Sequence, residues 1–172
     1  MSKSAIAYLG LGGNVGDVKS ALQWAHGEIG QLPSTSIIAV SPLYKTPPWG
    51  ITTQNWFLNA CLGIETGLKP HALLRALVDI ELRAGRKRDV RWGPRTLDID
   101  ILTYGDVSIR TPDLTIPHPR LLDRAFVMIP LAAIAGDMMI GRSHVRTIAS
   151  ALDEAGIEIE AEEWTGASSN AD

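Results

Sequence analysis

The sequence is short of residue types that define whole classes of protein. Its 172 residues include one cysteine, Cys61, so no disulfide can form within the chain, and a reducing compartment suits it. We interpret Cys61 as a small buried apolar residue in a strand. No apolar run approaches about 18 residues, and no basic start followed by an apolar stretch marks a signal peptide. We therefore expect a cytoplasmic protein with no membrane partner.

An excess of basic residues is missing as well. The chain has 16 Lys and Arg against 19 Asp and Glu, a net charge of −3, which argues against a general nucleic-acid-binding protein. The basic residues gather in 86–95, which holds five of them and one aspartate. The length and an apolar content of 45% predict a single domain over 1–160, followed by a flexible acidic tail over 161–172. We expect a monomer.

Hydrophobic periodicity predicts an alternation of strands and helices. The expected strands cover 5–11, 35–46, 55–66 and 97–105, and the expected helices cover 18–29, with Asp17 as N-cap, and 70–85. This order is that of a ferredoxin-like fold of the α+β class, with a βαββαβ core and an antiparallel sheet with helices packed on both faces. Later segments would extend the sheet and cover its second face: a short strand over 107–109, an apolar stretch over 125–134 and a helix over 142–155.

Two aspartates one residue apart stand in the last of these strands. In a strand, side chains at i and i+2 share a face and their Cα atoms lie about 7 Å apart, so Asp98 and Asp100 point the same way. Such a pair can hold one or two magnesium ions and leave the remaining positions to water and substrate phosphates. The pattern alone is weak, because many strands end in two solvated aspartates.

Four arginines precede the aspartates on an expected loop: Arg86, Arg88, Arg91 and Arg95. Guanidinium groups match phosphate oxygens, although a basic run is more often a solvated surface or an RNA contact. The neighbouring carboxylates favour a polyphosphate bound with magnesium. Trp92 in the same loop is either a hydrophobic anchor or a residue of a lid.

Several motifs together resemble one family. The run "RWGPRTLDIDIL", residues 91–102, resembles the signature of the 6-hydroxymethyl-7,8-dihydropterin pyrophosphokinases, and "YLGLGGNVGD", "SPLYKTPPWG", "FLNA", "IELRAGR" and "IPHPRLLDRAFV" agree in order and spacing. The resemblance runs from about residue 5 to residue 152. It implies transfer of the pyrophosphoryl group of ATP to the pterin hydroxymethyl group, with release of AMP, in folate biosynthesis.

The resemblance also implies roles for single residues. Asp98 and Asp100 would bind two Mg2+ ions, and Arg86 and Arg95 would contact phosphates and assist the reaction. The positions that match pterin contacts are Thr46, Pro48, Trp49, Phe57, Asn59 and Phe126, with the two phenylalanines stacking on the pterin. The positions that match ATP contacts are Glu81, Arg88, Trp92, Ile101, Thr115, His118 and Arg124.

Other readings stay open on the residues alone. The chain could be another magnesium-dependent nucleotidyl or phosphoryl transferase, or an RNA-binding ferredoxin-like module. The glycine-rich run at 10–16 fits neither a dinucleotide fingerprint nor a P-loop, and we interpret it as a structural turn from strand to helix. Asp113 departs from the family pattern, because some relatives carry a basic residue there.

Overall fold

Strands that alternate apolar and polar or small residues form the centre of the molecule. The structure, a computed structural model, describes residues 3–47, 56–85, 97–154 and 156–166. Its main sheet is antiparallel, in the order β10 (Glu158–Ala161), β3 (Leu43–Thr46), β4 (Phe57–Thr66), β1 (Ala5–Gly13), β5 (Asp98–Tyr104). A further strand, β2 (Thr35–Val40), pairs with β4 beside β3. Along the chain, the order of strands and helices matches the predicted βαββαβ core, with β2 and β3 standing for its second strand.

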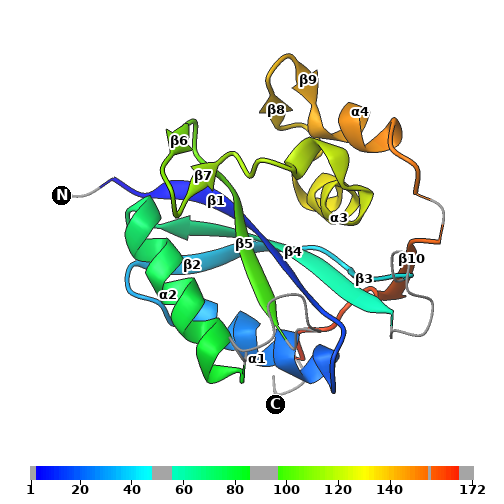
Figure 1. Ribbon diagram of the computed structural model, residues 1–172, viewed down its shortest axis with the longest axis horizontal. Coiled ribbons are helices and arrows are strands. Elements are labelled where there is room, and N and C mark those ends of the chain that lie inside the picture. The colour runs from blue at the N-terminus through cyan, green and yellow to red at the C-terminus, as the bar shows by residue number, and fades with distance from the viewer. Residues whose placement is uncertain (1–2, 48–55, 86–96, 155, 167–172) are drawn as a thin grey trace.

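Two helices cover one face of this sheet, which we name the core face (Figure 1). They are α1 (Val18–Gly30) and α2 (Pro70–Arg83), and their apolar stripes pack with the strand residues that point toward them. Leu9, Leu62 and Ile99 are among these buried strand residues. The Asp17 side chain accepts a hydrogen bond of 3.1 Å from the Ser20 backbone N–H, so the predicted N-cap of α1 is confirmed.

The opposite face, named the α3 face, is covered over part of its area. There α3 (Ala125–Ala135) and α4 (Val145–Ser150) pack on Cys61 and Leu102 and form a second buried cluster (Figure 1). The 3-10 helix η1 (Leu121–Asp123) precedes α3. Two small hairpins complete the described structure: β6 (Ile109–Arg110) with β7 (Thr115–Ile116), and β8 (Met139–Ile140) with β9 (Ser143–His144). Helices therefore lie on both faces, as predicted.

Three of the differences from the predicted element boundaries have a clear local cause. The strand predicted over 35–46 is two strands, because Ser41 and Pro42 interrupt it and Pro42 has no backbone N–H to donate. The helix predicted over 142–155 is reduced to α4, because the β8–β9 hairpin turns at Gly141, whose φ is +63°. The short strand expected at 107–109 is β6, which begins at Ile109 because Val107 closes a turn onto the Tyr104 carbonyl.

The segment that follows residue 160 takes part in the fold as far as it is described. Ala161 is the last residue of β10, and Trp164 is 2% exposed. The Trp164 indole N–H donates to the Ser41 carbonyl at 2.8 Å, and the Gln23 side-chain amide donates to the Trp164 carbonyl. The described structure thus includes residues 161–166 of the expected flexible tail, and the predicted domain boundary stays a prediction.

No helix within the described ranges is both long and apolar enough to span a membrane.

Candidate active site

The two aspartates of β5 lie on the α3 face of the sheet. Ile99 between them is buried on the core face, so strand alternation turns Asp98 and Asp100 to the other side, where both stay partly exposed. Two carboxylates on one side of a strand suit Mg2+, which completes its octahedron with water and phosphate oxygens. Within the described residues, no group of three or more His, Cys, Asp or Glu is arranged to hold a metal. As two ligands, Asp98 and Asp100 suit a magnesium ion whose remaining positions are filled by water and substrate oxygens.

The sheet register places one predicted pterin residue, Asn59, in the same row as Asp98. Asp98 lies opposite Gly12 of β1, Gly12 lies opposite Asn59 of β4, and Asn59 lies opposite Tyr44 of β3. Directly opposed residues of neighbouring strands point to the same face. Asp98 and Asn59 therefore both point to the α3 face, and β1 lies between them at Gly12.

Gly12 leaves the space in which the Asn59 side chain lies. A Cβ atom on Gly12 would stand 2.5 Å from Asn59 Oδ1 and 3.1 Å from the Leu58 carbonyl oxygen. The first distance would force the Asn59 side chain to move, and the second is tight against a backbone atom that cannot move independently. Gly12 is therefore part of the site. The interpretation of the glycine-rich run as only a turn was incomplete, because β1 continues through Gly13.

The Asn59 amide is held in one orientation. Asn59 Nδ2 donates a hydrogen bond of 3.1 Å to Thr46 Oγ1, and Thr46 shares the α3 face with it. Both side chains are largely buried, with 9% and 6% of each residue exposed. A buried amide whose N–H2 is committed to a hydroxyl has a fixed carbonyl direction. The structure thus brings together two of the predicted pterin residues.

Phe57 and Phe126 lie on elements that frame this region. Phe57 is the first residue of β4, directly opposite Thr46, and Phe126 is in the first turn of α3. Both are half-buried. The Arg124 guanidinium carbon lies 5.6 Å from the centre of the Phe126 ring, within cation–π range. An aromatic ring and a cation are therefore presented together at the start of α3.

His118 borders the aspartates from the other side. Its backbone N–H donates to the Leu102 carbonyl at 2.9 Å, and its Nε2 lies 4.0 Å from Asp100 Oδ2. The Arg120 backbone N–H donates to His118 Nδ1 at 3.2 Å, which leaves the ring proton of the neutral form on Nε2. Burial lowers the pKa of His118, and the charges of Arg124 and Arg120 lower it further against the opposite effect of Asp98. The neutral form, with Nε2–H toward Asp100, is therefore favoured.

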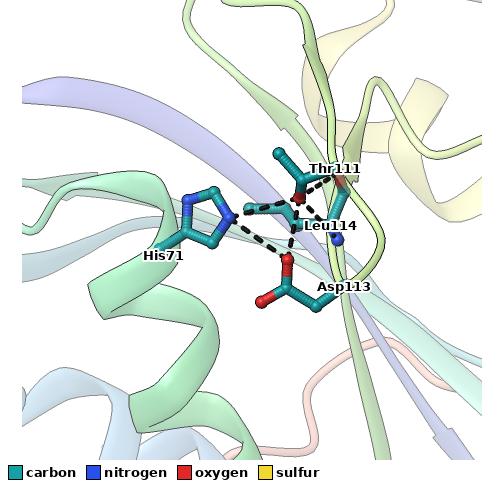
Figure 2. A network of polar contacts seen from close by, with 4 residues as sticks. All are labelled: His71, Thr111, Asp113 and Leu114. Carbon is teal, nitrogen blue, oxygen red and sulfur yellow. Dashed lines mark hydrogen bonds and ion pairs between the residues drawn. The ribbon is translucent and has the colours of Figure 1, made fainter.

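A polar network fixes the turn that leads to His118 (Figure 2). Thr111 Oγ1 donates to Asp113 Oδ1 at 2.8 Å, and His71 Nε2 on α2 lies 3.3 Å from both oxygens. The Leu114 N–H donates to Thr111 Oγ1 at 3.1 Å. Asp113, the departure from the family pattern, thus joins the β6–β7 turn to α2. The next residue is Thr115, predicted to contact ATP.

The remaining predicted residues divide into two groups. Glu81 and Ile101 are buried on the core side, and Glu81 Oε2 accepts a hydrogen bond of 2.7 Å from the Ile99 backbone N–H. Because the Ile101 side chain is in the core, only the backbone of Ile101 could contact a nucleotide. The other predicted residues lie outside the described part of the chain: Pro48, Trp49, Arg86, Arg88, Trp92 and Arg95.

Comparison with known proteins identifies the family of this chain. Residues 8–136 match the family model for 7,8-dihydro-6-hydroxymethylpterin-pyrophosphokinase. A 2-amino-4-hydroxy-6-hydroxymethyldihydropteridine pyrophosphokinase of Methylorubrum extorquens is 47% identical over 152 residues, 88% of this chain and 96% of the relative. The protein of that name from Pseudomonas aeruginosa is 43% identical over 153 residues, 88% of this chain and 94% of the relative.

Solved structures agree at the level of the fold. The Plasmodium falciparum HPPK-DHPS structure with pteroate superposes with a TM-score of 0.70 at 15% identity, covering 87% of this chain. This chain spans 44% of that longer one. The sequence matches decide among the three hypotheses of function that the residues alone left open. The chain belongs to the 6-hydroxymethyl-7,8-dihydropterin pyrophosphokinase family, ATP-dependent enzymes that transfer pyrophosphate from ATP to the hydroxymethyl group of the pterin in folate synthesis.

Proposed function

We propose that this transfer takes place on the part of the α3 face that α3 leaves uncovered, with Asp98 and Asp100 as ligands of two Mg2+ ions. The observation that carries the proposal is the row of Asp98, Gly12 and Asn59 across three neighbouring strands. It sets a carboxylate pair suited to a phosphate-bound cation beside an amide suited to a heterocycle. Bound magnesium would neutralise phosphate charge and favour attack on the β-phosphorus, with AMP as leaving group.

The pterin would bind at the Asn59 end of the row. Its amide, held by Thr46, offers a carbonyl acceptor of fixed direction to an N–H of the heterocycle. Phe57 and Phe126, both half-buried, would stack on the flat ring. Pro48 and Trp49 belong to the same expected pterin site. The hydroxymethyl group would then point along the row toward Asp98.

The ATP side of the proposal rests on residues near the outer edge of β5. His118, with a proton on Nε2, can donate to a phosphate or hydroxyl oxygen, and Arg124 adds a positive charge at the start of α3. Thr115 and the backbone of Ile101 are proposed to complete the nucleotide contacts on this side, where the family resemblance also implies Glu81. Arg86 and Arg95 are proposed to stabilise the moving pyrophosphoryl group, and Arg88 and Trp92 to contact ATP. The protein is proposed to be a cytoplasmic monomer.

The test mixes the protein with ATP, Mg2+ and 6-hydroxymethyl-7,8-dihydropterin and separates the nucleotides by chromatography. We expect AMP in equal amount to the pyrophosphorylated pterin. Asp98→Ala and Asp100→Ala should each reduce turnover by about a thousandfold or more, because phosphate charge is no longer neutralised in place, while far-UV circular dichroism stays unchanged. Full activity in either variant would refute the metal assignment, and ADP as product would refute attack on the β-phosphorus.

A further inference from the structure

We propose that Glu81 is a positioning residue that fixes the aspartate-bearing strand β5 along its outer edge. The proposal rests on the function proposed above, because the strand segment that Glu81 holds is the one that carries Asp98 and Asp100. It assigns Glu81 a task that differs from the ATP contact implied by the family resemblance.

The hydrogen bond from Glu81 acts on the residue between the two aspartates. Among the described strands, β5 pairs with β1 alone, so its other edge has no strand to bond with. The Ile99 backbone N–H donates to Glu81 Oε2 at 2.7 Å, a short distance for an N–H donor. The Ile99 side chain is itself buried between the sheet and the helices. The Ile99 main chain is therefore fixed by a hydrogen bond, and its side chain by packing in the core.

The location of the carboxylate is costly unless it serves such a contact. Glu81 continues the buried stripe of α2 formed by Leu73, Leu77 and Ile80, and it is 3% exposed. Burial of a carboxylate is unfavourable without hydrogen bonds, and the last turn of a helix is the negative end of its dipole. An apolar side chain would satisfy the packing at lower cost. The carboxylate at this position therefore serves as an acceptor for the strand.

A second contact holds the same edge on the other side of Asp100. The His118 N–H donates to the Leu102 carbonyl at 2.9 Å, next to an irregularity in the pairing of β5 with β1. Bulges bend strands and turn their side chains in new directions. Asp100 thus lies between two bonded points, Ile99 and Leu102. The directions of both carboxylates are set before a metal arrives, as efficient metal sites require.

The first experiment measures hydrogen exchange at the Ile99 amide by nuclear magnetic resonance, without substrate or metal. In the natural protein, exchange should be slow although none of the described strands pairs with this edge. Glu81→Gln keeps an acceptor of the same size and should speed exchange severalfold, whereas Glu81→Met, which has none, should speed it about 10- to 100-fold. Asp79→Asn, on an exposed position of the same helix, is the matched control and should leave exchange unchanged. Unchanged exchange in Glu81→Met would overturn the proposal.

The second experiment separates positioning from nucleotide contact. For Glu81→Met we expect kcat to fall about tenfold or more and the Mg2+ concentration for half-maximal rate to rise, while the affinity for ATP without metal, measured by calorimetry, changes less than about twofold. Glu81→Gln should lie between it and the natural protein. A large loss of metal-free ATP affinity with kcat unchanged would overturn the proposal in favour of direct contact. If the natural protein formed no AMP, the proposed function would fail, and amide exchange would still decide whether Glu81 holds the strand.

Discussion

At the scale of the residue, the site depends on a side chain that is absent. Gly12 separates Asp98 from Asn59, and its missing Cβ leaves room for Asn59 Oδ1 over β1 while Asn59 Nδ2 donates to Thr46 on β3. The proposed recognition of the heterocycle by Asn59 therefore depends on a residue that offers no functional group. The functional groups of the row are the Asp98 carboxylate and the Asn59 amide, one on each side of Gly12.

A substitution at Gly12 tests this dependence. Gly12→Ala should raise the KM for the pterin about tenfold or more, because the new methyl group displaces Asn59, whereas the affinity for ATP should stay the same. Gly27→Ala is the control, since a Cβ at this position of α1 meets nothing within 4 Å and alanine favours a helix. Steady-state kinetics and ATP calorimetry on both variants provide the measurement. An unchanged pterin KM in Gly12→Ala would exclude the role.

Site residues that form a local sequence pattern could be predicted. Site residues whose role depends on which residue lies opposite in the neighbouring strand could not. The pair Asp98 and Asp100 follows from strand alternation alone, and the structure places both on one face as expected. The role of Gly12 depends on which residue of β4 lies opposite, which no local pattern records. A signal for Glu81 did exist. A carboxylate on the apolar stripe of α2 indicates a buried acceptor, although its partner on β5 is distant in sequence.

At the scale of the element, α3 connects the second buried cluster to the site. Met128 and Leu131 of this helix are completely buried against Cys61 and Leu102, while Phe126 and its neighbour Arg124 lie at its first turn. The packing of α3 on the sheet therefore sets where an aromatic ring and a cation meet the site. The sequence marked this segment as apolar without indicating a helix, since Pro130 stands inside it.

Truncation of one side chain under α3 should affect stability and the pterin site together. Met128→Ala should lower the free energy of unfolding by about 2–5 kcal/mol, because it leaves a cavity between the helix and the sheet. It should also raise the pterin KM, since Phe126 loses its support. Met139→Ala, at a position 50% exposed, should change neither quantity appreciably. Urea denaturation and pterin kinetics compare the pair, and equal stability of the two variants would contradict the packing described here.

At the scale of the whole molecule, the end of the described chain closes the fold. Trp164 packs edge-on against His26 of α1, with 6.1 Å between ring centres, and its indole N–H bonds to the carbonyl of Ser41, where β2 gives way to β3. One residue thus joins a helix and the break between two strands. Two glutamates directly precede the tryptophan, and composition predicts a flexible acidic tail from residue 161, yet the Trp164 ring itself is buried.

Removal of this ring should destabilise the whole domain. Trp164→Ala is expected to lower the free energy of unfolding by about 3–5 kcal/mol, through the lost contacts and the cavity left behind. Trp24→Ala removes a tryptophan that is 38% exposed on α1 and should have a much smaller effect. Thermal denaturation followed by circular dichroism measures both. A Trp164→Ala variant as stable as the natural protein would show that the domain ends before this residue.

The same contact makes stability depend on pH. Burial lowers the pKa of His26 below its ordinary value of 6.5, so the unfolded chain takes up a proton at a higher pH than the folded one. The contribution of His26 is intact above pH 6.5 and is lost as the pH falls through the folded pKa. His26→Gln should therefore lose less stability than the natural protein between about pH 7.5 and about pH 5. His144→Gln, at an exposed position, is the control, and equal pH dependence in all three proteins would contradict the assignment.

The glycines of β1 have a consequence for inhibitor resistance. A compound that lies on the row from Asp98 to Asn59 would rest at Gly12 on main chain, so a mutation there cannot remove a contact and can only add bulk. Added bulk at Gly12 displaces Asn59, on which the proposed recognition of the natural substrate depends as well. An inhibitor that contacts only this row would therefore leave the organism few resistance mutations that still permit growth without external folate.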